Sequence, residues 1–152
     1  MASAAKKTGS QPTVDPQAQK LAEQIIEILE EKSASRILSI NLEHVNPYFC
    51  IFVIASANSM VQLKTLGREV QKRLGHELRV KGLKTDDIES GWVILDFSDV
   101  ILHLFLPDQR AFYNLERLWG DAPVIYRSQD LIAESEAGNK KGQTAGGKHH
   151  GD

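Results

Sequence analysis

Residues 91–124 constrain the fold more than any other stretch, because two short apolar runs are followed there by a helical pattern. The runs 92–95 and 100–106 are separated by four residues, Asp96-Phe97-Ser98-Asp99, as expected of a buried β-hairpin. Pro107 stops the second run, and Asp108 supplies a carboxylate that can cap a helix. We therefore expect a hairpin followed by one helix that ends at Gly120, with its apolar positions at Phe112, Leu115, Leu118 and Trp119.

Alternation along the hairpin predicts that one of its faces belongs to the core. If Phe97 and Ser98 form the loop, Val93 lies opposite Leu102. That face then carries only apolar residues, which are Val93, Leu95, Val100, Leu102, Leu104 and Leu106.

The second face of the hairpin is mixed in character. The same register places Trp92 opposite His103 and Asp96 opposite Asp99, and Phe105 extends this face. A like-charge pair of this kind costs about 0.2 to 1 kcal/mol in a free protein. Two interpretations stay open: the face contacts a basic partner that accepts aromatic groups, or His103 is buried under a helix and the aspartates cap a turn.

The rest of the chain predicts one domain over residues 16–133. We expect a helix over 16–32, strands over 37–42 and 49–55, a helix over 60–74, a short strand over 76–81, a polar connection over 82–91, and either a short strand or core cover at 124–126. The continuous apolar run 49–55 is typical of a central strand. Residues 1–15 and 134–152 have the composition of disordered tails. The predicted fold is α/β, a small mixed β-sheet packed by about three helices.

Composition and charge limit the classes of function. No run approaches the roughly 18 apolar residues of a membrane span, and no signal peptide is evident, so we expect a cytoplasmic protein without a membrane contact. The single cysteine, Cys50, lies in an apolar run and is interpreted as a buried hydrophobe. Residues 64–84 contain seven basic and two acidic residues, whereas residues 86–121 contain eight acidic residues against two arginines.

The helix predicted over 60–74 has a basic side. This side carries Lys64, Arg68, Lys72 and Arg73. A basic helix side is most often only solvated, and the alternative is contact with RNA phosphates without sequence specificity.

The hairpin and the following helix also carry a residue pattern that resembles a known family. The pattern consists of Trp92, Asp96, Asp99-Val100, His103, Phe105, Arg110, Tyr113, Leu115-Glu116 and Leu118-Trp119-Gly120-Asp121-Ala122. It is similar to that of the ribosomal silencing factors, also called the RsfS or Iojap-like family. Ser98 departs from the family, which usually has glycine at this position, so the hairpin register can differ from the one above.

The resemblance implies a fold, partners and a mechanism. The fold would be similar to that of nucleotidyltransferases, and the free protein would form a homodimer. The protein would bind the large ribosomal subunit through the basic ribosomal protein uL14. It would then block joining of the small subunit sterically and lower translation when nutrients are scarce. An auxiliary contact with ribosomal RNA is the alternative that the basic helix side offers, and the resemblance does not imply it.

The predicted contact combines acidic and aromatic side chains. Its residues are Trp92, Asp96, Asp99, His103, Arg110, Tyr113, Glu116 and Asp121. We predict no catalytic residues, metal or cofactor. The alternatives are an RNA-binding ribosome-assembly factor and an enzyme with a metal at Asp96, Asp99 and His103. The chain has neither a Gly-Ser pair at a predicted helix start nor the Asp-x-Asp motif that follows it on a strand in nucleotidyltransferases, which argues against the enzyme.

Overall fold

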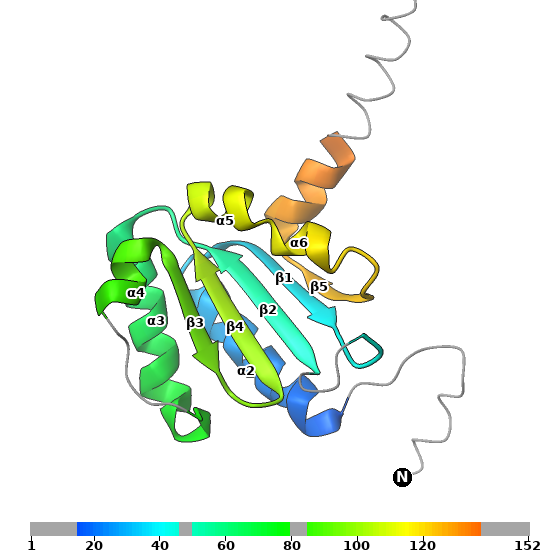
Figure 1. Ribbon diagram of the computed structural model, residues 1–152, viewed down its shortest axis with the longest axis horizontal. Helices are drawn as coiled ribbons and strands as arrows, with labels where there is room; N and C mark the ends of the chain where they lie inside the picture. Colours follow the sequence, from blue (N-terminus) through cyan, green and yellow to red (C-terminus); the bar gives the residue numbers. More distant parts are fainter. Residues whose placement is uncertain (1–14, 46–49, 80–84, 138–152) are drawn as a thin grey trace, which may run out of the picture.

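The computed structural model describes residues 15–45, 50–79 and 85–137, and these residues form an α/β domain with a mixed sheet (Figure 1). The strands are β1 (Ser35–Asn41), β2 (Ile51–Ser56), β3 (Trp92–Asp96), β4 (Val100–Phe105) and β5 (Val124–Arg127). Their order in the sheet is β3-β4-β2-β1-β5. β2 and β4 pair in parallel, and the other neighbours are antiparallel. The predicted fold class, a small mixed α/β sheet, is confirmed.

Strand β2 occupies the centre of the sheet, as the continuous apolar run predicted. All six of its residues are buried. It begins two residues later than expected, and Phe49, the first residue of the predicted strand, lies outside the described residues. A strand that is covered on both faces needs apolar side chains in both alternating sets, which explains the absence of alternation in its sequence.

Two long amphipathic helices cover one face of the sheet. Helix α2 (Pro16–Glu31) begins at Asp15, whose carboxylate accepts the backbone N–H of Ala18 at 3.0 Å. Helix α3 (Met60–Leu74) begins at Ser59, whose hydroxyl accepts the backbone N–H of Gln62 at 3.1 Å. Both helices bury their apolar stripes in one cluster with the sheet, as the sequence predicted.

The other face of the sheet is covered by shorter elements. Helices α5 (Pro107–Tyr113) and α6 (Leu115–Leu118) lie over it, and a further helix follows β5 over residues 129–137 (Figure 1). Trp119, directly after α6, packs edge-on against Phe52 of β2 with ring centroids 6.0 Å apart. This smaller cluster also contains Leu115 and Leu131.

The hairpin has the predicted faces but not the predicted register. Trp92 lies opposite Phe105, and Asp96 lies opposite Ile101, which is a shift of two residues. The backbone N–H of Phe97 donates to the carbonyl of Val100 at 2.9 Å, so Ser98 and Asp99 form the turn. Ser98 has a φ of 78°, in the region that favours glycine. Because an even shift keeps every side chain on its face, the core face is as expected. Asp96 and Asp99 are not opposite each other, so the predicted like-charge pair is wrong.

The single helix predicted up to Gly120 is wrong, because the chain breaks at Asn114. Asn114 has φ 45° and ψ 57°, the left-handed conformation, and its N–H donates to the carbonyl of Arg110 at 2.8 Å. The cap was also misassigned: Leu106 is the N-cap and Pro107 begins the helix, so Asp108 lies in its first turn. Because of the break, the residues before and after Asn114 do not share one helical face. Phe112 and Leu118, which were expected on a common apolar stripe, are exposed.

Three further elements differ from the expectations. Residues 76–79 form no strand, because the 3₁₀ helix Gly75–Glu77 continues α3; residues 80 and 81 lie outside the described residues. The polar connection contains helix α4 (Thr85–Ser90). Glu134, assigned to the C-terminal tail, lies within the helix 129–137. The short strand expected at 124–126 is confirmed as β5.

Candidate partner-binding surface

Trp92 forms the base of an aromatic cluster at one end of the edge strand β3. Its indole N–H donates to Nδ1 of His103 at 3.1 Å. Its ring stacks on Phe105 with centroids 5.1 Å apart and contacts Tyr113 at 4.4 Å. The strand and helix α5 are therefore joined by aromatic contacts, and the half-buried Trp92 is fixed in orientation.

Helix α5 adds two exposed aromatic residues to this cluster. Phe112 is 79% exposed and Tyr113 is 46% exposed, and their rings meet edge to face at 5.0 Å. Ile94 lies two residues from Trp92 on the same face of β3 and is also exposed. We call Trp92, Ile94, Phe112 and Tyr113 the edge surface. Exposed aromatic groups held rigidly in this way are typical of protein interfaces.

A glycine sets the entry to β3. Gly91 has φ 82°, and its carbonyl accepts the N–H of Leu106 at 2.9 Å. A Cβ at this position would meet the amide oxygen of Gln109 at 2.8 Å. The Gln109 side chain is flexible and can move aside, so it is the positive φ that favours glycine at this position.

The predicted aspartates lie at the far end of β3. Asp96 shares the face of Trp92 and Ile94, about 14 Å along the strand from Trp92. Its carboxylate accepts the N–H of Ser98 at 2.8 Å and lies 3.9 Å from the guanidinium of Arg79. Asp99 is exposed in the turn. The hairpin thus carries aromatic groups at one end and carboxylates at the other.

His103 is buried beneath the edge surface and is 5% exposed. Burial lowers the pKa of His103 from 6.5 to about 4, so the imidazole is neutral at physiological pH. Nδ1 accepts the hydrogen bond from Trp92, which places the proton on Nε2; this atom has no hydrogen-bond partner in the described part of the chain. The burial agrees with the interpretation, left open above, that His103 belongs to the core, where it accepts the hydrogen bond that holds Trp92. A direct partner contact of His103 stays a prediction.

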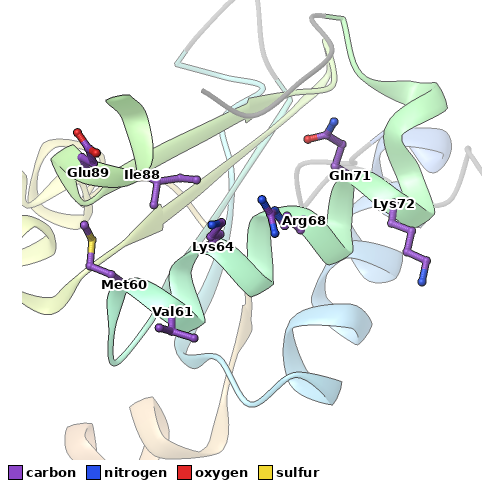
Figure 2. Close-up of a pocket in the computed structure, with 8 residues that line it drawn as sticks. All are labelled: Met60, Val61, Lys64, Arg68, Gln71, Lys72, Ile88 and Glu89. Atoms are coloured by element: carbon purple, nitrogen blue, oxygen red, sulfur yellow. The ribbon is translucent and has the colours of Figure 1, made fainter. Parts of the chain in front are cut away.

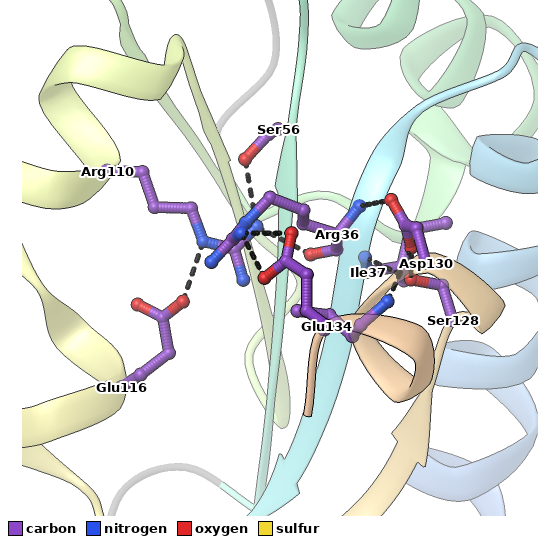
Figure 3. Close-up of polar contacts among 9 residues, drawn as sticks. Arg36, Ile37, Ser56, Arg110, Glu116, Ser128, Asp130 and Glu134 are labelled. Atoms are coloured by element: carbon purple, nitrogen blue, oxygen red, sulfur yellow. Dashed lines mark hydrogen bonds and ion pairs between the residues drawn. The ribbon is translucent and has the colours of Figure 1, made fainter. Parts of the chain in front are cut away.

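Arg110 is likewise turned inward, with 4% of its side chain exposed. Its Nε donates to the Glu116 carboxylate at 2.7 Å, and one terminal nitrogen donates to the hydroxyl of Ser56 at 2.9 Å and to the carbonyl of Arg36 at 2.5 Å (Figure 3). Burial lowers the pKa of Arg110, and the nearby Glu116 carboxylate opposes this shift. Arg110 and Glu116 therefore tie α5 and α6 to the end of the sheet. Arg110 is buried in the free protein, whereas Glu116 is partly exposed, and a partner contact of either residue stays a prediction.

Arg36 completes this polar network, and no pattern in the sequence indicated its role. Its φ of 51° lies at a register irregularity of β1 between Ser35 and Leu38, and its carbonyl accepts from Arg110. Its backbone N–H donates to Asp130 at 2.8 Å and its side chain pairs with Glu134 at 2.6 Å (Figure 3). The helix 129–137 is thereby held against the same end of the sheet.

Asp121 is separated from the other predicted residues. It is exposed after α6, two residues before Pro123, whose carbonyl accepts from Asn41 of β1. β5 follows directly and forms the sheet edge opposite β3, about 19 Å away at four strand spacings. Of the eight predicted residues, the structure brings Trp92 and Tyr113 together at the surface, and it adds Phe112 and Ile94, which the sequence did not indicate.

The geometry gives little support to the enzyme alternative. No group of three or more metal-ligating side chains was found among the described residues. His103 is buried opposite Ile94, whereas Asp99 is exposed in the turn, so His103, Asp96 and Asp99 do not form such a group. In the part of the chain that the structure describes, no helix combines the length and apolar character that crossing a membrane requires.

The described residues thus form an α/β domain with a mixed five-stranded sheet and an exposed aromatic edge. The family described as "Ribosomal silencing factor during starvation" matches residues 15–151. The chain therefore belongs to the ribosomal silencing factor family, as its hairpin pattern predicted. The family description names a silencing factor and not an enzyme.

Individual relatives agree with this assignment. The chain is 32% identical over 108 residues to "Ribosomal silencing factor RsfS" of Halalkalibacterium halodurans, covering 70% of this chain and 92% of the relative. It is 28% identical over 102 residues to the mouse protein "Mitochondrial assembly of ribosomal large subunit protein 1", covering 62% and 43%. A crystal structure of a protein from Chromobacterium violaceum matches with a TM-score of 0.61 and 29% identity, covering 68% of this chain and 86% of that one.

Proposed function

We propose that this protein represses translation by binding the large ribosomal subunit and sterically blocking the small subunit. The direct partner is the basic ribosomal protein uL14, as the resemblance to the family implied. Family membership supports a ribosome-associated repressor, and the name of the mouse relative refers to the large subunit. The setting is nutrient limitation in the cytoplasm, in accord with the words "during starvation" in the family description.

One observation supports the proposed location of the contact. Phe112 and Tyr113 of α5 are exposed, and Tyr113 packs against Trp92, which is hydrogen-bonded to the buried His103. Phe112 and Tyr113 expose 79% and 46% of their surface, and Tyr113 contacts Trp92 at 4.4 Å. Large aromatic side chains contribute most of the affinity in many interfaces because they bury area at a low entropic cost. The edge surface is therefore the proposed centre of the contact.

Charge supports a basic partner at the same edge. Asp96 and Asp99 lie at the turn end of β3, and Asp99 has no charged partner among the described residues. Carboxylates at the rim of an interface speed association with a basic partner, and salt weakens this attraction by screening the charges. In this proposal the aromatic end supplies affinity and the acidic turn supplies steering.

The mechanism needs no chemistry beyond binding. A folded domain that occupies part of the inter-subunit surface excludes the other subunit by volume alone. The free protein is proposed to be a homodimer, which analytical ultracentrifugation would test by its mass. A mass of 16.9 kDa at every concentration would contradict the dimer.

Sedimentation of the protein with isolated large subunits, isolated small subunits and joined ribosomes tests the proposal. We expect comigration with large subunits alone and a smaller fraction of joined ribosomes as protein is added. The variant Asp99→Lys should bind more weakly at low salt and approach the parent at high salt, because only steering is changed. Comigration with neither subunit would contradict the proposed function.

A further inference from the structure

Helix α3 carries a row of basic side chains on the side that faces helix α4. Lys64, Arg68 and Lys72 recur every four residues, and all three are exposed (Figure 2). At 1.5 Å of rise per residue the row extends about 12 Å along the helix. It lines a groove of about 710 Å³ together with Met60, Val61, Gln71, Ile88 and Glu89.

These cations differ from the neighbouring Arg73 in lacking partners. Arg73 donates to Glu31 at 2.8 Å and to Glu69 at 2.8 Å, so its charge is satisfied within the fold. For Lys64, Arg68 and Lys72 no ion pair or hydrogen bond is formed with any residue that the structure describes. Among the described side chains that line the groove, Glu89 is the single carboxylate. The groove therefore has an uncompensated positive charge.

We propose that this groove binds the phosphate backbone of ribosomal RNA. The inference rests on the proposed function, because it supplies a second contact for the same bound state. In a DNA duplex each strand carries a phosphate about every 3.4 Å of axis, so a row of about 12 Å faces three or four such charges. Lysine and arginine on one helix side bind phosphates without reading sequence.

The lining favours RNA over an acidic protein. Three apolar side chains line the groove: Met60 and Val61 are exposed at one end, and Ile88 of α4 is partly buried against the core. The exposed lining beyond Met60 and Val61 is charged. A stable protein contact needs a desolvated apolar core, whereas phosphate contacts remain polar and wet.

The position of the groove allows both contacts at once. Helix α4 leads through Gly91 into β3, so the groove and the edge surface flank the same sheet edge from opposite faces (Figure 1). A single molecule can therefore contact a ribosomal protein through α5 and β3 and ribosomal RNA through α3.

A matched pair of variants tests the inference. Lys64→Gln with Arg68→Gln removes two charges from the groove, and Lys20→Gln with Arg127→Gln removes the same two charges from exposed positions elsewhere. Binding to purified large subunits and to isolated uL14 is measured between 50 and 200 mM salt. Loss of two phosphate contacts should reduce the slope of log affinity against log salt by about 1.4 to 1.8. Subunit affinity should fall about tenfold at 100 mM salt.

The controls separate this inference from the proposed function. Affinity for isolated uL14 should be unchanged in the groove variant, and the Lys20 and Arg127 variant should match the parent throughout. A photo-crosslinking residue at position 61, which is 75% exposed, should give an adduct with large subunits that ribonuclease removes. An unchanged salt slope, or an adduct with a protein alone, would overturn the inference. Failure of the parent protein to bind large subunits would instead overturn the proposed function.

Discussion

The two faces of the sheet are covered in different ways. Long helices α2 and α3 close one face with a continuous apolar cluster. The opposite face is covered by the short helices α5 and α6 and the helix 129–137, and it holds the buried His103 and Arg110. The long amphipathic helices close one face with a continuous apolar cluster, whereas the short, interrupted ones leave Phe112 and Tyr113 exposed.

The break at Asn114 is the local cause of this difference. An uninterrupted helix would continue its apolar stripe toward the sheet, but the left-handed Asn114 ends α5 after Tyr113. Phe112 is consequently exposed, and the following α6 is fixed by Leu115, Trp119 and the Glu116 to Arg110 ion pair.

The largest expected effect on stability is in the closed face. Leu66→Ala removes a fully buried side chain from α3 and should lower the free energy of unfolding by about 2 to 5 kcal/mol. Urea denaturation followed by circular dichroism measures this loss. The folded fraction should bind large subunits with parental affinity. A loss below about 1 kcal/mol would mean that this face is not the tightly packed one.

Removal of Arg110 should destabilise the open face strongly. Arg110→Ala leaves the Glu116 carboxylate and the carbonyl of Arg36 without their donor, and loss of one member of a buried ion pair costs about 3 to 5 kcal/mol. Because the Glu116 side chain is 26% exposed, we expect a value near the lower end. Arg117→Ala, an exposed position on α6, is the control and should be nearly neutral in the same urea titration. Equal stability of both variants would contradict a structural role for Arg110.

The buried His103 makes stability depend on pH. Its folded pKa of about 4 lies below its ordinary value of 6.5, so between these values the unfolded chain binds more protons than the folded one. Its contribution to stability is therefore complete above pH 6.5 and is lost as pH falls toward 4, with a limiting slope of about 1.4 kcal/mol per pH unit.

The variant His103→Gln isolates that contribution from the carboxylates, which titrate near the same range. Denaturation at several pH values should show a shallower loss of stability between pH 6.5 and 4 in the variant than in the parent. Parallel curves for the two proteins would show that His103 is not held neutral by burial.

The smallest expected effect on stability accompanies a large effect on binding. Phe112→Ala removes a side chain that is 79% exposed and should change unfolding by less than about 0.5 kcal/mol. Because Phe112 is the proposed centre of the interface, the same substitution should weaken binding to the large subunit by about 30-fold, or about 2 kcal/mol. Val124→Ala on the opposite sheet edge is the control and should leave binding unaltered. Equal binding by both variants would place the contact elsewhere.

The sequence could predict features that depend on local periodicity. The apolar stripes of residues 16–32 and 60–74 and the run 49–55 each dictate burial directly, and the corresponding elements are present. The hairpin faces were also predictable, because a register shift of two residues preserves side-chain alternation. Trp92 was a surface candidate from this alternation, whereas Tyr113 was one from its place on the predicted helix and in the family pattern.

Features set by single backbone conformations or distant partners could not be predicted. The positive φ values at Ser98 and Asn114 determine the hairpin turn and the helix break, and neither residue type requires them. Arg110 is buried because Arg36, 74 positions away, presents its carbonyl at an irregularity in β1. A basic residue with such partners is indistinguishable in the sequence from an exposed one.

The inhibition of subunit joining by the double variant Phe112→Ala and Tyr113→Ala tests the central claim most directly. Light scattering measures the protein concentration that halves the formation of joined ribosomes, and urea denaturation of the same preparation measures stability. We predict an increase of at least about 30-fold in that concentration, with less than about 1 kcal/mol lost in unfolding. Inhibition equal to that of the parent by a normally stable double variant would contradict the assignment of the edge surface as the binding face.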